Sequence, residues 1–245
     1  MQSLRSSEDY IYKHVLNVAI LSAIIAGQMG FPVGRINLLV KSAILHDIGA
    51  LKLQQLPDAE DLDDGTKEVV KKNTQETLAR YGDLDEEVLR LIAQMQELYT
   101  RESDAEIPAG LKESVNANIL YVADAYDRMT AMKSFEEPTS EVKAVRELLA
   151  DEERYNKKIV NALIHGISIL YPGVCVELSN GEKGLVITGN EENIFEPTVL
   201  DFRNNNLYDL SDPSVKQTVE IADVMKTMDN RIKLDKSLLE EYQAN

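Results

Sequence analysis

The stretch that decides the fold class is Ala43-Ile44-Leu45-His46-Asp47-Ile48-Gly49, residues 43–49. In it an imidazole and a carboxylate are adjacent at the point where an apolar helical pattern ends. Both side chains are ligands for divalent metal ions. Neighbouring ligands can converge on one ion where the chain turns at the end of a helix. The dipeptide alone is a weak signal, so the flanking sequence has to support it.

Apolar residues recur at helical spacing through most of the first 170 positions, for example at Val15, Val18 and Leu21. This pattern predicts a mainly α-helical protein. The expected helices cover residues 8–29, 35–45, 67–81, 85–100, 112–132, 140–150 and 156–170. The segment between residues 45 and 67 carries five acidic residues at 58–64, which is typical of a solvated loop.

The periodicity changes after Tyr171-Pro172-Gly173, where apolar and other residues alternate and turn residues follow at 179–182. The pattern predicts a hairpin and further short strands, and then a terminal helix. The expected strands cover residues 174–178, 184–188, 198–202, 207–210 and 218–221, and the helix covers residues 224–242. We therefore expect two domains, a helical one at 1–170 and a small β extension with a terminal helix at 171–245.

The chain is strongly acidic, with 42 Asp and Glu against 26 Lys and Arg and a net charge of −16 over 245 residues. This charge repels phosphate backbones, so we expect neither nucleic acid nor anionic membrane as a partner. The single cysteine, Cys175, and the absence of a secretory signal in residues 1–30 favour a reducing, cytoplasmic location. The longest apolar stretch, Val15–Met29, is shorter than the roughly 20 residues that span a bilayer, so no transmembrane helix is expected.

Few residues in the helical half can carry chemistry. His14 and His46 are two of only three histidines, and the third, His165, fits no ligand pattern. Asp124 lies within an apolar run, where a buried carboxylate needs a partner, and a metal ion would serve. Asp127 follows one turn later and could orient a ligand. We expect Asn17 to make a structural bond of the same supporting kind.

His14, His46-Asp47 and Asp124 together resemble the H…HD…D ligand set of the HD superfamily of metal-dependent phosphohydrolases. Residues 12–19, 43–49 and 122–127 are similar to the HD-GYP branch, whose active members hydrolyse cyclic di-GMP at a site with two or three metals. Residues 171–182 resemble the β extension that often follows the HD-GYP helices. The resemblance implies an HD-type helical bundle with a small C-terminal β extension. It also implies one divalent ion, Fe, Mn, Zn or Mg, on those four residues.

The chain departs from the HD-GYP pattern on one side of the expected site. The departures are Ala50 in place of a lysine, Asn73, Met95 and Gln96 in place of histidines, and Glu106 and Ile107 in place of the Gly-Tyr of the GYP loop. Phosphodiester hydrolysis needs a metal-activated hydroxide and positive charge on the phosphate oxygens. We therefore expect no appreciable hydrolysis of cyclic di-GMP.

Three functions remain open at this point. The first, which we favour, is a non-catalytic signalling module that binds a nucleotide, a cyclic dinucleotide or a signalling protein. The second is a mononuclear HD phosphohydrolase that acts on a nucleotide or another phosphomonoester. The third is a purely structural interaction domain with a metal-free cluster. The amphipathic first helix could form a homodimer, as HD-GYP relatives often do, or be buried in the bundle.

Overall fold

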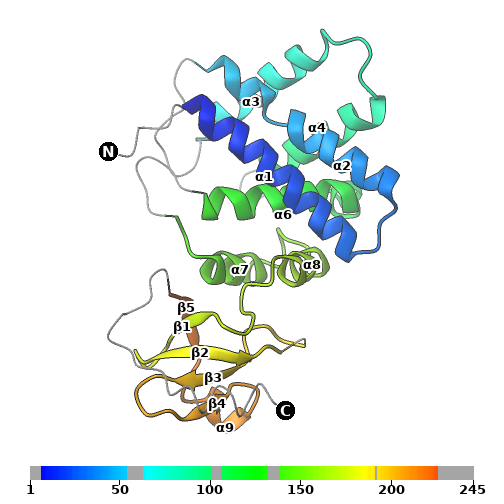
Figure 1. Ribbon diagram of the computed structural model, residues 1–245. Coiled ribbons are helices and arrows are strands. Elements are labelled where there is room, and N and C mark those ends of the chain that lie inside the picture. Colours follow the sequence, from blue (N-terminus) through cyan, green and yellow to red (C-terminus); the bar gives the residue numbers. More distant parts are fainter. Residues whose placement is uncertain (1–6, 54–62, 101–105, 132–137, 191, 226–245) are drawn as a thin grey trace. The chain divides into compact units, whose positions relative to one another are not determined.

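The computed structural model describes residues 7–53, 63–100, 106–131, 138–190 and 192–225 (Figure 1). The chain divides into two compact units. The first comprises residues 1–139 and 144–167, and the second comprises residues 140–143 and 168–245. Among the described residues, helices form the first unit and an antiparallel sheet forms most of the second, which confirms the predicted mainly helical architecture with a small C-terminal β part.

Helix α6 lies at the centre of the helical unit, and every residue from Ala117 to Asp127 is buried. Helix α1 packs against α2, α6 and α8, and α4 packs against α2 and α6. The helices are α1 Ser7–Gln28, α2 Val33–Leu45, the 3-10 helix η1 Ile48–Lys52, α3 Asp64–Leu78, α4 Glu86–Tyr99, α5 Ala109–Lys112, α6 Val115–Thr130, α7 Glu141–Ala150 and α8 Lys157–Ile167. This packing brings the chain turn after α2 next to the middle of α1 and α6.

The second unit contains a five-stranded antiparallel sheet with the strand order β4-β3-β2-β1-β5. Its elements are β1 Cys175–Leu178, β2 Lys183–Thr188, β3 Thr198–Asp201, β4 Leu207–Asp209, α9 Pro213–Lys216 and β5 Ile221–Val224. The predicted hairpin is present as β1 and β2. Gly181 in its turn has a φ of +81°, a conformation that residues with a Cβ rarely adopt.

Several helix boundaries differ from the predictions. α3 begins at Asp64 rather than Lys67, because the Asp63 side chain caps the helix by accepting a hydrogen bond from the Thr66 backbone N–H (2.9 Å). The predicted helix at 112–132 is interrupted at Ser114, whose ψ of 87° is not helical. α8 ends at Ile167 because Ser168 has a φ of +47°.

The last strand was also placed wrongly. β5 covers Ile221–Val224 rather than residues 218–221, because the short helix α9 and the turn after it occupy the preceding residues. Val224, expected to begin a terminal helix, lies in β5. The remainder of that expected helix, residues 226–242, lies outside the described residues.

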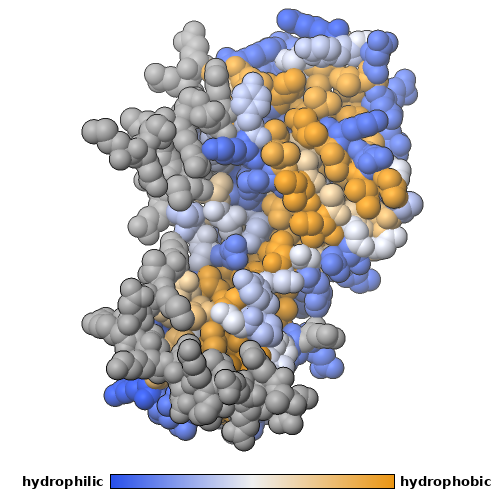
Figure 2. Space-filling view, viewed as in Figure 1, coloured by the Kyte–Doolittle hydropathy of each residue, from blue (hydrophilic) through white to orange (hydrophobic). Residues whose placement is uncertain are grey.

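Helix α1 contains a 19-residue stretch, Tyr10–Gln28, that by length and composition is long and apolar enough to cross a membrane. The apolar window begins at Tyr10 and is therefore longer than the expected stretch from Val15 to Met29. Figure 2 shows apolar surface along this helix, where Tyr12, Leu16 and Ile20 are exposed. The opposite face is buried against α2, α6 and α8, as in a core helix of a globular unit.

Candidate metal centre

The four predicted ligands come from three parts of the helical unit. His14 lies in α1, His46 caps the C-terminus of α2, Asp47 follows it, and Asp124 lies in α6. All four side chains are buried. The Asp124 carboxylate therefore has the polar partners that its apolar surroundings require.

The donor atoms of these residues converge. Asp124 Oδ1 lies 3.0 Å from His14 Nε2 and 3.2 Å from His46 Nε2. Asp47 Oδ2 lies 3.8 Å and 4.0 Å from the same two nitrogens. Atoms that bind one ion at about 2.1 Å lie roughly 3 to 4 Å from one another. The ligand atoms of His14, His46 and Asp124, which all lie within 4.8 Å of one another, therefore fit a single divalent ion, and Asp47 Oδ2 lies near the two nitrogens.

Both imidazole rings are held by their other nitrogen. His14 Nδ1 donates to Asp127 Oδ2 (2.7 Å), and His46 Nδ1 donates to the Ala43 carbonyl (2.6 Å). Metal-binding histidines usually donate this second N–H to a carboxylate or a carbonyl, which fixes the ring and leaves Nε2 for the metal. Asp127 also accepts a hydrogen bond from Asn17 Nδ2 (2.8 Å), so both predicted supporting residues lie beside His14.

Sequence reasoning missed one residue of the centre, Arg128. Its Nε donates to Asp124 Oδ2 and its Nη2 donates to Asp47 Oδ2, each at 2.9 Å. Its guanidinium carbon lies 4.7 Å from the centre of the Tyr99 ring. The spacing of Asp124 and Arg128, four residues apart on a helix, is the signal that could have revealed the first of these contacts.

The electrostatics of the cluster favour charged carboxylates. Burial raises the pKa of Asp124, but the Arg128 guanidinium and hydrogen bonds from both histidines hold it well below its usual range. Arg128 and the histidines likewise overcome burial and lower the pKa of Asp47. Burial and Arg128 both lower the pKa of His14, yet hydrogen bonds to Asp124 and Asp127 outweigh them and raise it to about 9. Without a metal, the Arg128 guanidinium and the protonated His14 ring therefore both offset the charge of the three carboxylates. A metal ion on Nε2 would replace the His14 proton.

The residues that replace HD-GYP histidines are engaged elsewhere. Gln96 Nε2 donates to the His46 carbonyl (3.0 Å), and Met95 is buried in the core. Asn73 Nδ2 lies 3.5 Å from the Gly49 carbonyl, beside η1. None of these three side chains offers an imidazole to a second ion.

The remaining departures lie in η1 and in the segment before α5. Ala50 packs in an apolar cluster with Ile11, Val15 and Val70. Glu106 and Ile107 lie in the segment before α5, and His165 is exposed near the end of α8.

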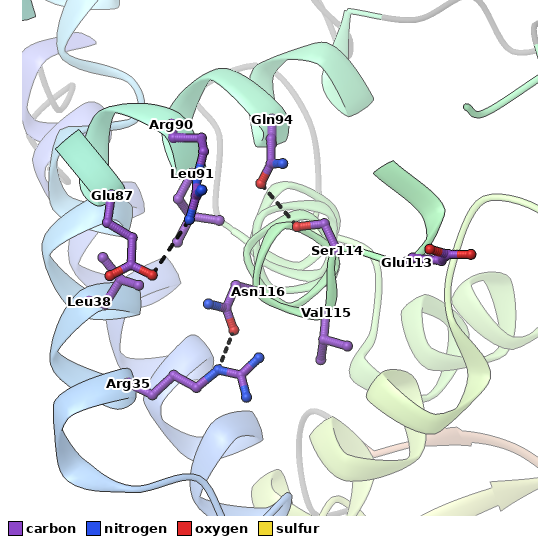
Figure 3. A pocket seen from close by; sticks show the side chains of 10 residues that line it. All are labelled: Arg35, Leu38, Glu87, Arg90, Leu91, Gln94, Glu113, Ser114, Val115 and Asn116. Atoms are coloured by element: carbon purple, nitrogen blue, oxygen red, sulfur yellow. Dashed lines mark hydrogen bonds and ion pairs between the residues drawn. The ribbon is translucent and has the colours of Figure 1, made fainter. Parts of the chain in front are cut away.

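A separate pocket of about 240 Å³ lies between α2, α4 and the start of α6 (Figure 3). Its polar side chains pair with one another, as Arg35 with Asn116, Ser114 with Gln94, and Arg90 with Glu87. No lining residue belongs to the histidine and aspartate cluster, so the pocket adds nothing to the metal centre.

Comparison with known proteins shows what the helical region is similar to. Residues 11–129 match the family model of the HD domain. The chain is 22% identical over 204 residues to the cyclic di-GMP phosphodiesterase PA4108 of Pseudomonas aeruginosa, over 81% of this chain and 49% of that protein. It is 24% identical over 225 residues to the cyclic di-GMP phosphodiesterase PdeB of Borreliella burgdorferi, over 87% of this chain and 58% of that protein. The chain spans about half the length of these curated relatives.

Proposed function

We propose that this chain is a signalling module that holds one divalent ion and does not hydrolyse cyclic di-GMP. The proposal starts from its HD-type helical fold with a small β unit and from its distant homology to cyclic di-GMP phosphodiesterases. The ion would be held by His14, His46, Asp47 and Asp124. The proposed ligand is a nucleotide, a cyclic dinucleotide or a signalling protein.

The observation that carries the proposal is the arrangement of the two histidines. Each Nδ1 is committed to an acceptor, and both Nε2 atoms lie within 3.2 Å of Asp124 Oδ1. Without an ion these two contacts are hydrogen bonds that need a proton on Nε2, and a divalent ion would take the place of that proton. When bound, a divalent ion would polarise a phosphoryl oxygen and lower the pKa of a bound water.

We infer the lack of cyclic di-GMP hydrolysis from the side chains that surround the histidine and aspartate cluster. Two-metal phosphoesterases hold their ions about 3.5–4 Å apart on two sets of ligands. Here Asn73, Met95 and Gln96 stand where the second set would be expected, and Gln96 is bonded to the backbone of His46. Ala50 adds no cation for a phosphate.

A second function is favoured by one observation, the buried cluster of His14, His46 and Asp124 with the Asp47 carboxylate beside its two nitrogens. A mononuclear HD phosphohydrolase would use this set on a nucleotide or another phosphomonoester.

Metal content measured by elemental analysis of dialysed protein tests the site. We expect about one equivalent in the native chain and in Asp83→Ala, an exposed control, and none in Asp47→Ala. Protein without metal after reconstitution with Fe²⁺, Mn²⁺ or Zn²⁺ would contradict the proposal.

Turnover assays with each ion then separate the two functions. Hydrolysis of cyclic di-GMP that is lost in Asp47→Ala would refute the signalling proposal. Hydrolysis of a nucleoside monophosphate with the same dependence on Asp47 would establish the second function instead.

A further inference from the structure

We propose that Arg128 is a fixed internal cation that takes the place of a second divalent ion, so that the centre accepts one ion and not two. This inference deepens the proposed function and rests on its metal site. It concerns a residue that the HD ligand pattern does not include.

The two oxygens of Asp124 have different neighbours. Oδ1 faces His14 Nε2 and His46 Nε2, whereas Oδ2 accepts a hydrogen bond from Arg128 Nε. The same guanidinium reaches Asp47 Oδ2 through Nη2. Asp47 Oδ2 is also the oxygen that lies beside the two histidine nitrogens, so only at Asp124 does Arg128 hold an oxygen that faces away from the first ion. A second ion that shared Asp124 with the first would have to bind Oδ2, which Arg128 holds.

The guanidinium is held firmly enough to keep this position. Two parallel N–H bonds to two carboxylates are charge-assisted and fix the plane of the group. The ring of Tyr99 lies 4.7 Å from its carbon atom, and only 17% of the Arg128 side chain is exposed. Arginine does not lose its proton in proteins, so the positive charge is permanent.

The alternative role for Arg128 is to orient the two aspartates for the ion between the histidines. The two roles predict opposite effects of removing the side chain. If Arg128 only orients ligands, its loss weakens the binding of the ion. If it replaces a second cation, its loss frees Asp124 Oδ2 for a second ion, leaves Asp47 Oδ2 to the first ion and removes a repulsive charge, so the centre binds more metal and binds it more tightly.

Titration of the metal-depleted full chain with Mn²⁺ distinguishes these roles. Binding is measured by calorimetry, and pairs of Mn²⁺ ions are detected through their spin coupling in electron paramagnetic resonance. The variants are Arg128→Met and the matched control Arg35→Met, since Arg35 also lies over an aromatic ring, that of Phe31, but bonds to Asn116 rather than to a carboxylate. We expect one ion in the native chain and in R35M. In R128M we expect at least tenfold tighter binding of the first ion and a second, spin-coupled ion. Because Asn73, Met95 and Gln96 supply no imidazole, the second ion would be held by Asp124 Oδ2 and water and would bind more weakly than the first.

Arg128→Lys is a second variant that keeps the test decisive if R128M does not fold. Lysine keeps the charge but lacks the forked donors. We expect R128K to bind one ion, and two ions in R128K would overturn the proposal because the charge is retained.

The remaining outcomes separate this inference from the proposed function. One ion in both the native chain and R128M, with equal or weaker affinity in R128M, would overturn the inference and leave the proposed site intact. Two ions in the native chain would also overturn it. No ion in the native chain but one in R128M would refute the proposed function and also overturn the inference, because Arg128 would then exclude the first ion rather than a second. No ion in either protein would refute both.

Discussion

Asp127 connects two neighbours of the metal centre through its two carboxylate oxygens, which accept from His14 Nδ1 and Asn17 Nδ2. The carboxylate fixes the ring and increases the basicity of Nε2. We therefore expect Asp127→Asn to weaken Mn²⁺ binding by about 10- to 100-fold. Calorimetry measures the affinity, and Asn17→Ala, which removes only one neutral donor, should have the smaller effect. Unchanged affinity in D127N would show that His14 needs no such support.

Gly49 is a second residue on which the centre depends, because it lies two positions after Asp47 and its N–H donates to Thr74 Oγ1 (3.0 Å). A Cβ on Gly49 would lie 2.3 Å from the Val70 carbonyl oxygen and 2.4 Å from the Thr74 nitrogen. Since both are backbone atoms, η1 and α3 must move apart. We expect Gly49→Ala to cost about 2 kcal/mol or more in the free energy of unfolding measured with urea.

Gly34→Ala is the matched control for this change. Nothing lies within 4 Å of a Cβ at Gly34, and the residue is helical, so this variant should be neutral or slightly more stable. Equal stability of the two variants would contradict the close contact between η1 and α3.

The residues of the centre were predictable to different degrees. His14, His46, Asp47 and Asp124 follow from a resemblance to a known ligand pattern, and their role as metal ligands stays a prediction. Arg128 could not be assigned in the same way, because its contact with Asp47 joins residues 81 positions apart. Spacing along one helix shows which residues share a face, but only the packing of α6 against the end of α2 shows what that face meets.

At the scale of elements, the buried face and the exposed face of α1 contribute differently to stability. Val18 is fully buried, whereas Leu16, two residues earlier, is 55% exposed. We expect Val18→Ala to cost about 2 kcal/mol, through lost burial and the cavity left behind. Leu16→Ala should change stability by no more than about 0.5 kcal/mol. Urea unfolding measures both, and a larger loss for L16A would mean that a partner covers the exposed face.

The existence of the elements followed from periodicity, but several of their ends did not. The acidic run before α3 predicted a loop, yet Asp63 within it supplies the helix cap. The apolar pattern of α8 continues to Leu170, although the left-handed conformation of Ser168 ends the helix at Ile167. Each of these boundaries is set by one residue's backbone or capping bond, and a pattern averaged over many residues does not detect it.

At the scale of the whole molecule, the net charge of −16 is the dominant electrostatic feature. Exposed ion pairs such as Lys157–Glu152 each contribute little and cannot offset it. Like charges that are gathered in a folded chain repel one another more than in the unfolded chain. Because salt screens this repulsion, moderate salt should favour the folded state.

We therefore expect the melting temperature of the metal-depleted chain to rise between 0.05 and 0.5 M NaCl. Relief of repulsion on the order of 1 kcal/mol corresponds to about 2–4 °C for a chain of this size. Glu153→Lys reverses one exposed charge and reduces the net negative charge from −16 to −14. The variant should therefore melt at a higher temperature than the native chain at low salt, and the difference should disappear at high salt. Calorimetric scans measure both effects. A melting temperature that falls with added salt would mean that attraction within ion pairs, including those of Arg128 with Asp47 and Asp124, outweighs the repulsion of the acidic surface.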